Sequence, residues 1–274
     1  MYKYKTLIVE KTGEAMTVSM NRPQIMNALN NELLLEMRDL LGKLRYDLET
    51  RFVIFTGAGK VFTSGVDFSP ASMQSRYSNP ELPNERIWQC FGHDFMRAME
   101  NLEQITIAAV NGAAIGGGLC IAMNCDFRIA AENAIFGIPE ANLGIFYTWG
   151  ATPRLTALIG PAKAKELIMT CDPISAQEAW RIGLVNKVVP GIQLMESCRE
   201  LIAKLATKGP LALRICKKQV NVASLAKVND LYPLEAEIVE AIMRSGQAEE
   251  GARAFMEKRA PVFKDPALNL SPGD

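Results

Sequence analysis

The sequence predicts an α/β fold with a helical region at its C-terminal end. Apolar, β-rich runs alternate with amphipathic helical segments over the first two thirds of the chain, and from about Gly191 onward only helical apolar spacing remains. The length of 274 residues, with 49% hydrophobic and 22% charged residues, is typical of a globular protein built on one large domain. We therefore divide the chain into a core at 1–191, a helical region at 192–265 and a tail at 266–274.

The first part of the chain begins with two strands that are joined by a turn signal, Thr12-Gly13-Glu14, which predicts a hairpin. Asn30 is the residue type that caps a helix, and the following segment has helical apolar spacing. The polar, proline-containing stretch from Met73 to Glu85 predicts a surface loop. In chain order, the predicted elements are strands at 6–11 and 15–21, a helix at 31–49, a strand at 51–57, and a helix at 87–102.

The second part continues with a strand, a glycine turn and a short apolar helix, and then becomes largely helical. In chain order, the predicted elements are a strand at 105–110, a helix at 119–125, strands at 126–131 and 134–139, helices at 153–160, 161–171 and 175–183, a strand at 184–190, and helices at 193–209, 210–224, 232–246 and 249–263.

Charge and composition exclude several classes of function. Thirty basic and thirty acidic residues give no net charge, so no basic excess is present to bind nucleic acid. The single histidine, His93, excludes a zinc site built on several histidines, and we predict no metal. We expect His93 to serve in packing or on the surface of its helix, with a role in lining a pocket as the alternative.

The six cysteines contain no CxxC pair and no signal peptide precedes them, which predicts reduced thiols and a cytoplasmic protein. The uncharged run from Gln104 to Cys125 is long enough to suggest a membrane span. Thr106, Asn111 and three consecutive glycines would break such a helix, so we predict a buried strand, a turn and a buried helix instead.

The glycines Gly116 to Gly118 lie between that strand and that helix. The first backbone N–H groups of a helix have no internal partner, and glycine lets a ligand approach them closely. Such a turn can bind a phosphate or polarise a carbonyl oxygen. The sequence lacks the Lys-Ser/Thr of a P-loop and the GxGxxG spacing of a dinucleotide site. Close packing of the strand against the helix is the alternative explanation for the glycines.

Two further segments complete a possible active site. The loop at 62–68, FTSGVDF, also follows a strand and contains glycine, so it can supply the second N–H donor that an oxyanion hole needs. Glu140 follows Pro139 in apolar surroundings, which raise the pKa of a carboxyl group toward the range useful for acid–base catalysis. A structural hydrogen-bonding role for Glu140 is the alternative. Asp67 is expected to cap a helix or anchor its loop.

These segments, in this order, resemble the crotonase (enoyl-CoA hydratase/isomerase) superfamily. The resemblance implies a ββα spiral core with a C-terminal helical region, and a homotrimer or a hexamer made of two trimers. It also implies an acyl-CoA thioester as substrate, so that coenzyme A enters with the substrate and no cofactor is permanently bound. The resemblance rests on the segments NRPQIMNALN, FTSGVDF, ITIAAVNGAAIGGG, CDFRIAAENAIFGIPEANLGI, ISAQEAWRIGLVNKVVP and EGARAFMEKR.

The resemblance also implies roles for individual residues. The backbone N–H groups of Val66 and Gly117 match the two donors that hold the thioester oxygen while an enolate forms. Asn27 and Ala28 match the loop that binds coenzyme A. The C-terminal positions that approach the nucleotide part of the coenzyme are matched by Phe255 and Lys258.

The sequence departs from the family at the acid–base residues. Hydratases of the family carry two glutamates twenty positions apart; Glu140 matches the second, and Cys120 stands at the place of the first. Tyr147, Thr148 and Trp149 replace a proline and glycine cluster beside the expected acyl pocket, where they can narrow the pocket, contact the acyl group or simply pack the loop. Tyr147 could also donate a proton or hold a water molecule. Cys120 is expected to pack, with a nucleophilic role as the minor alternative.

One carboxylate is enough to move a proton between two carbons. The resemblance therefore favours isomerisation of an enoyl-CoA double bond, or an atypical hydration, with Glu140 as the single acid–base group. A family member that binds acyl-CoA without turning it over is one alternative. A thioester or carbon–carbon hydrolase using the same pocket is the other.

Overall fold

The structure is a computed structural model, and it describes residues 3–76, 84–225, 243–244 and 246–262. The first sheet has the strand order β1-β2-β3-β4-β6-β9; β1 and β2 pair antiparallel as the predicted hairpin, and every later pair is parallel. A smaller sheet has the order β5-β7-β8. The strands are β1 Leu7–Thr12, β2 Ala15–Met20, β3 Phe52–Gly57, β4 Ile105–Val110, β5 Ala114–Ile115, β6 Phe127–Ala131, β7 Ile135–Gly137, β8 Ile174–Ser175 and β9 Lys187–Val189.

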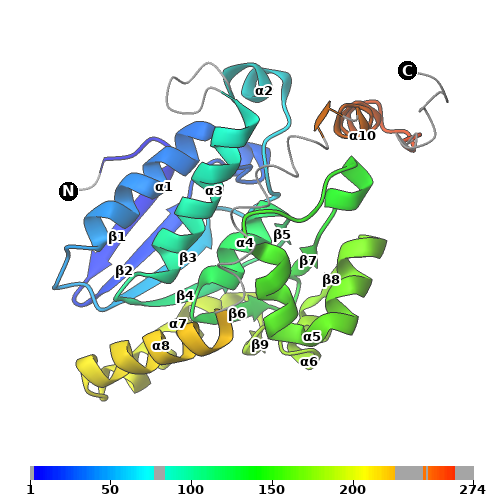
Figure 1. Cartoon of the computed structure of the whole chain (residues 1–274). Coiled ribbons are helices and arrows are strands. Elements are labelled where there is room, and N and C mark those ends of the chain that lie inside the picture. Colours follow the sequence, from blue (N-terminus) through cyan, green and yellow to red (C-terminus); the bar gives the residue numbers. More distant parts are fainter. Residues whose placement is uncertain (1–2, 77–83, 226–242, 245, 263–274) are drawn as a thin grey trace.

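Helices lie on both faces of the first sheet (Figure 1), and within the described residues α7, α8 and α10 follow β9. The α-helices are α1 Asn31–Leu44, α2 Pro70–Arg76, α3 Glu85–Glu100, α4 Gly117–Asn124, α5 Ala151–Thr170, α6 Ala176–Arg181, α7 Leu194–Ala206, α8 Pro210–Leu225 and α10 Gln247–Met256. The short 3-10 helices are η1 Pro23–Ile25, η2 Glu140–Leu143 and η3 Gly191–Gln193. The mixed α/β class and the helical C-terminal region are as predicted.

Helix α1 shows how local sequence sets an element. The side chain of Asn30 accepts a hydrogen bond from the Leu33 N–H at 3.0 Å, which satisfies a donor that the helix itself leaves unpaired. The buried side chains of α1 recur at helical spacing and form one apolar face. The helix ends at Leu44 rather than at the predicted residue 49, because Asp47 accepts the N–H groups of Glu49 and Thr50 in a turn.

The core is divided between the two faces of the first sheet. Along β3, the side chains of Val53 and Phe55 join the large cluster beneath α1, α3 and α4, whereas Ile54 joins a smaller cluster that α7 covers. Leu194 and Cys198 of α7 are buried in that smaller cluster. The boundary predicted at residue 191 therefore marks a change of secondary structure, and the core continues beyond it.

One predicted loop is wrong in part. Residues 70–76 form α2 and Glu85 begins α3, so both ends of the stretch predicted as a loop are helical. Ser69 explains the first helix, because its Oγ accepts the Ser72 N–H at 3.3 Å and its carbonyl accepts the Met73 N–H. Asn84 caps the second in the same manner. Most of the predicted helix at 232–246 and the tail at 266–274 lie outside the described residues.

Candidate active site

Each of the three glycines is needed at its position for a different local reason. Gly116 has φ of 51° and ψ of −119°, a backbone conformation that residues with a side chain rarely adopt. A Cβ atom there would also lie 2.7 Å from Oε1 of Glu140. At Gly117 a Cβ would meet the Trp149 ring at 3.1 Å, and at Gly118 it would lie 2.5 Å from the side chain of Thr63. The glycines thus let the carboxyl group, the indole and the neighbouring loop approach the start of α4.

Two backbone N–H groups are placed to bind an oxyanion. Gly117 is the first residue of α4, where the N–H has no partner within the helix. Val66 pairs with Leu29 in an isolated parallel bridge, in which Leu29 bonds to Gly65 and Asp67. This pattern turns the Val66 N–H away from Leu29. Among the described residues, no backbone hydrogen bond uses the N–H of Val66 or of Gly117.

The loop that carries Val66 is tied to the loop predicted to bind coenzyme A. Asp67 forms an ion pair of 3.1 Å with Arg22, which also donates to the carbonyl of Ala28. Burial alone would raise the pKa of Asp67, but its hydrogen bonds with Ser69 and, to a smaller extent, the ion pair with Arg22 hold that pKa below its usual range. Asp67 therefore anchors its loop, as predicted.

Glu140 begins η2, and its carboxyl group lies against Gly116. Its Oε2 atom is buried and has no hydrogen-bond partner among the described residues. Burial disfavours the charged carboxylate and raises the pKa of Glu140 from about 4.5 to about 7, although its own backbone N–H opposes the shift. At neutral pH the group can both accept and release a proton, which is the property required of an acid–base catalyst.

A cavity of about 620 Å³ joins these groups, a volume in the range of small-molecule sites. Seven of the residues singled out from the sequence line it: Val66, Gly117, Cys120, Glu140, Tyr147, Thr148 and Trp149. The wall is mostly apolar, and its C-terminal side is formed by α10, which packs on η2. The geometry therefore brings one carboxyl group and two N–H donors to a largely apolar pocket.

Tyr147 and Trp149 are buried in the wall of this cavity. The Tyr147 hydroxyl donates to the carbonyl oxygen of Gly116 at 3.2 Å. Burial, with the nearby Cys120 and Glu140 as smaller causes, raises the pKa of Tyr147 well above its usual value. Trp149 has φ of 60°, and its ring lies 5.0 Å from that of Trp88, centroid to centroid. Its Nε1 atom is buried without a partner among the described residues.

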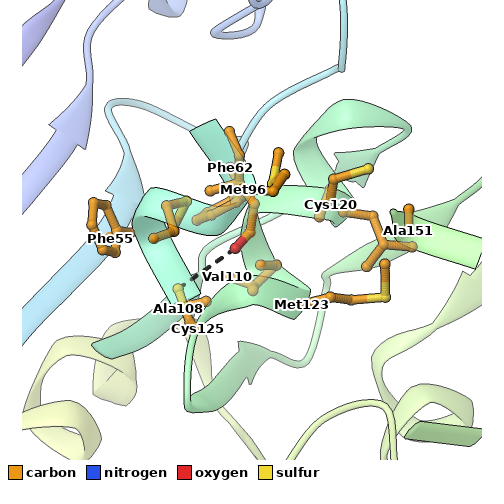
Figure 2. Packing of buried hydrophobic residues seen from close by; sticks show 14 of the residues in the cluster. Phe55, Phe62, Met96, Ala108, Val110, Cys120, Met123, Cys125 and Ala151 are labelled. Carbon is orange, nitrogen blue, oxygen red and sulfur yellow. Dashed lines mark hydrogen bonds between the residues drawn. The ribbon is translucent and has the colours of Figure 1, made fainter. Parts of the chain in front are cut away.

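Cys120 lines the cavity, and its buried side chain belongs to the hydrophobic core. Figure 2 shows it in the same group of packed side chains as Met96, Met123 and Ala151. It also contributes to the raised pKa of Tyr147, as a smaller cause than burial. No cationic side chain lines this cavity except Arg253 of α10, among the residues that the structure describes. This setting is typical of a packed thiol and not of an activated nucleophile.

The four residues predicted to contact coenzyme A are not among those that line the cavity. Asn27 has a buried side chain that bonds to the backbone of Arg22, Ala58 and Val61, so it shapes the loop that includes Ala28. Phe255 is 64% exposed and its ring lies 6.5 Å from that of Phe68. Lys258 follows α10 with φ of 53°.

Sequence reasoning missed the contribution of α3 and the cavity-facing residues of α10. Glu85, Trp88 and Gln89 of α3 line the cavity, as do Arg253 and Met256 of α10. A glycine inside α3 was an available signal, since a Cβ on Gly92 would lie 2.0 Å from Nε1 of Trp149. His93, the single histidine, is buried in α3 and does not line the cavity.

The described residues provide neither a metal site nor a membrane-spanning helix. Across the described ranges of the chain, no group of three or more His, Cys, Asp or Glu side chains is arranged to hold a metal ion. Within the same ranges, none of the helices combines the length and apolar character needed to cross a bilayer.

Comparison with known proteins adds to this geometry. The family described as enoyl-CoA hydratase/isomerase matches residues 10–266. A crotonyl-CoA hydratase of Syntrophomonas wolfei is 40% identical over 95% of this chain and 98% of its own length. A short-chain-enoyl-CoA hydratase of Clostridium acetobutylicum is 40% identical over 92% of this chain and 95% of its own length. The crystal structure of an enoyl-CoA hydratase from Mycobacterium avium subsp. paratuberculosis superposes with a TM-score of 0.85 at 27% identity, covering 96% of this chain and 100% of that one.

Proposed function

Because the chain belongs to the enoyl-CoA hydratase/isomerase family, we propose that its cavity binds an enoyl-CoA thioester and that Glu140 moves a proton on the acyl group. The observation that carries this proposal is the buried Glu140 carboxyl group against Gly116, beside the N–H groups of Val66 and Gly117, which have no backbone partner within the described part of the chain. Coenzyme A enters as part of the substrate.

The two N–H groups bind the thioester oxygen. Removing a proton from the carbon next to the thioester moves negative charge onto that oxygen, so donors already in place stabilise the enolate more than the bound substrate. Each such donor is worth about 10²- to 10³-fold in rate in enzymes where one has been removed. The apolar wall keeps this interaction strong by excluding water.

We favour isomerisation of the double bond as the reaction. In a 3-enoyl-CoA, Glu140 as a carboxylate takes a proton from the α carbon and the electron pair passes to the thioester oxygen as a dienolate. The same carboxyl group then returns the proton to the γ carbon, so the double bond moves to the 2 position and no atom is gained or lost. One group with a pKa near 7 serves both half-reactions.

Hydration is the second candidate, because the two 40%-identical relatives are named hydratases. Hydration needs a water molecule held near the β carbon. Where a second glutamate would stand in the family's hydratases, this chain has the buried thiol of Cys120, which is a weak hydrogen-bonding group. Glu85 supplies a second carboxyl group on the cavity wall, from a helix that the resemblance did not implicate.

The test compares 3-hexenoyl-CoA with crotonyl-CoA as substrates for the wild-type protein, Glu140→Gln and Glu249→Gln. Glu249 is an exposed carboxylate on the same cavity, so its variant is a matched control for charge. We expect the wild-type protein to catalyse isomerisation faster than hydration, and we expect Glu140→Gln to abolish isomerisation.

The other outcomes separate the alternatives. Full activity of Glu140→Gln would overturn the mechanism, and faster hydration of crotonyl-CoA would favour the second candidate. Tight binding of both thioesters without turnover would indicate a binding protein. Release of free coenzyme A would indicate a hydrolase.

The residues outside the cavity have proposed roles in the same complex. We assign Asn27 and Ala28 to the loop that holds coenzyme A, and Phe255 and Lys258 to its nucleotide part, where the cation suits the phosphates. The proposed assembly is a trimer or a pair of trimers. Charge reversal at Lys258 should raise KM for the thioester and leave kcat unchanged. The oligomeric state can be measured separately by light scattering, which gives the mass of the assembly.

A further inference from the structure

The peptide between Gly116 and Gly117 carries two hydrogen-bonding groups that face different parts of the site. Its N–H is the Gly117 donor, and its carbonyl oxygen accepts the Tyr147 hydroxyl at 3.2 Å. Resting on the proposed function, we propose that Tyr147 is a positioning residue that orients and polarises this peptide and so strengthens the oxyanion-binding N–H of Gly117. A protein that lacks this phenol would hold the same donor less firmly.

The bonds around this peptide fix its orientation. The Gly116 carbonyl also accepts the Cys120 N–H at 3.1 Å, the first hydrogen bond of α4. The Gly116 N–H donates to the carbonyl of Gly137 at 2.9 Å. Gly116 itself has no side chain to restrict its backbone, and its positive φ lies outside the helical region. The phenol therefore adds a restraint at a point where the local sequence provides little.

The Tyr147 hydroxyl donates its proton in the hydrogen bond to the carbonyl oxygen of Gly116. A tyrosine hydroxyl has one proton to donate, and here it points to Gly116. Because the side chain is buried and its pKa is raised, the hydroxyl stays protonated at every pH at which the enzyme would work. Tyr147 is thus not the source of a proton for the substrate, which leaves that role to Glu140.

The size of the effect follows from two general values. One hydrogen bond in a chain strengthens the next by about 10–30%. Loss of a whole oxyanion donor costs about 10²- to 10³-fold in kcat. Because the percentage applies to the free energy, and therefore to the logarithm of this factor, loss of the polarising bond should cost about 2- to 8-fold in kcat. The same factor should appear in the binding of an enolate relative to a neutral thioester.

The experiment measures the binding affinities of two thioesters that the proposed reaction does not convert. Acetoacetyl-CoA, a 3-ketoacyl thioester, can form an enolate that absorbs in the near ultraviolet, whereas butyryl-CoA presents a neutral carbonyl. We expect Tyr147→Phe to lower kcat by about 2- to 8-fold and the affinity ratio of acetoacetyl-CoA to butyryl-CoA by a similar factor. In Tyr147→Phe, the near-ultraviolet absorbance of bound acetoacetyl-CoA enolate should be lower than in the wild type. The shape of the pH–rate profile should be the same in both proteins.

Tyr4→Phe is the matched control, since it removes a hydroxyl that bonds to Asp39 on the surface. An unchanged ligand ratio in Tyr147→Phe would overturn the inference while leaving the proposed function intact. Loss of one limb of the pH–rate profile would overturn it too, because it would make the phenol a proton donor. If the wild-type protein bound neither thioester, the proposed function would fail and this inference with it.

Discussion

Replacing Glu140 with glutamine should stabilise the protein at alkaline pH while removing its activity. The wild-type carboxyl group is buried against Gly116, with one oxygen unpaired among the described residues. Above neutral pH the folded protein must hold a negative charge there, whereas in the unfolded chain the charge is in water. Glutamine has a similar shape and never ionises, so the variant avoids this cost.

The magnitude follows from the pKa. Burial raises the pKa of Glu140 to about 7 in the folded state, against about 4.5 in the unfolded chain. Between these values the folded protein binds more protons, so its free energy of unfolding falls as the pH rises. At 1.36 kcal/mol for each pH unit, the wild-type carboxyl group costs about 1 kcal/mol at pH 5 and about 3 kcal/mol at pH 8.5. The variant should gain these amounts relative to the wild type.

Thermal unfolding of the two proteins between pH 5 and pH 8.5 measures the effect. For a chain of this size, about 3 kcal/mol corresponds to a rise in Tm of about 6 to 12 °C. The difference in Tm should widen with increasing pH. Glu249→Gln, which removes an exposed carboxylate from the same cavity, measures the effect of losing one charge alone.

A Tm difference that does not change with pH would refute the reasoning, because it would mean that folding does not shift the Glu140 pKa. A variant that becomes less stable than the wild type as the pH rises would mean that the folded protein stabilises the carboxylate. Either result would also remove the physical basis for Glu140 as a group that both takes and returns a proton.

Three further predictions test the frame around the site. Gly116→Ala adds a Cβ atom 2.7 Å from Oε1 of Glu140 at a strained φ, and should lower kcat by about 10²-fold in steady-state assays by displacing the peptide that carries an oxyanion donor. Gly251→Ala places a Cβ atom 2.3 Å from the carbonyl oxygen of Leu143, so α10 should separate from η2, with a higher KM and faster proteolysis of the C-terminal helix. Asp67→Asn leaves its arginine partner without a countercharge, and urea unfolding should show a loss of about 3 kcal/mol.

The sequence predicted features that depend on neighbouring residues. The hairpin of β1 and β2, the cap at Asn30 and the order of strand, glycines and helix around Gly116 each follow from local chemistry. Glu140 was recognised because apolar neighbours predicted its burial, and burial dominates the shift of its pKa. The start of α2 was missed because Ser69, a single capping residue inside a polar stretch, was not recognised as a cap.

Contacts between distant segments were beyond such reasoning. The hydrogen bond from Tyr147 to Gly116 joins residues that are 31 positions apart, and nothing in either segment specifies it. The cavity-lining face of α3 has the same pattern as a face packed in the core, so Gln89 could not be told from a structural residue. Arg253 lines the cavity because α10 packs on η2, which is a tertiary arrangement.

The catalytic proposal and the stability prediction have one physical origin. A carboxyl group in water titrates too low to return a proton efficiently at neutral pH, and burial corrects this by making the charged form unfavourable. The same burial destabilises the fold increasingly as the pH rises from about 4.5 to about 7, and the chain must obtain the lost free energy from its core. The glycines serve this arrangement by leaving room: Gly116 admits the carboxyl group and Gly117 admits the indole of Trp149. The site therefore depends as much on side chains that are missing as on those that are present.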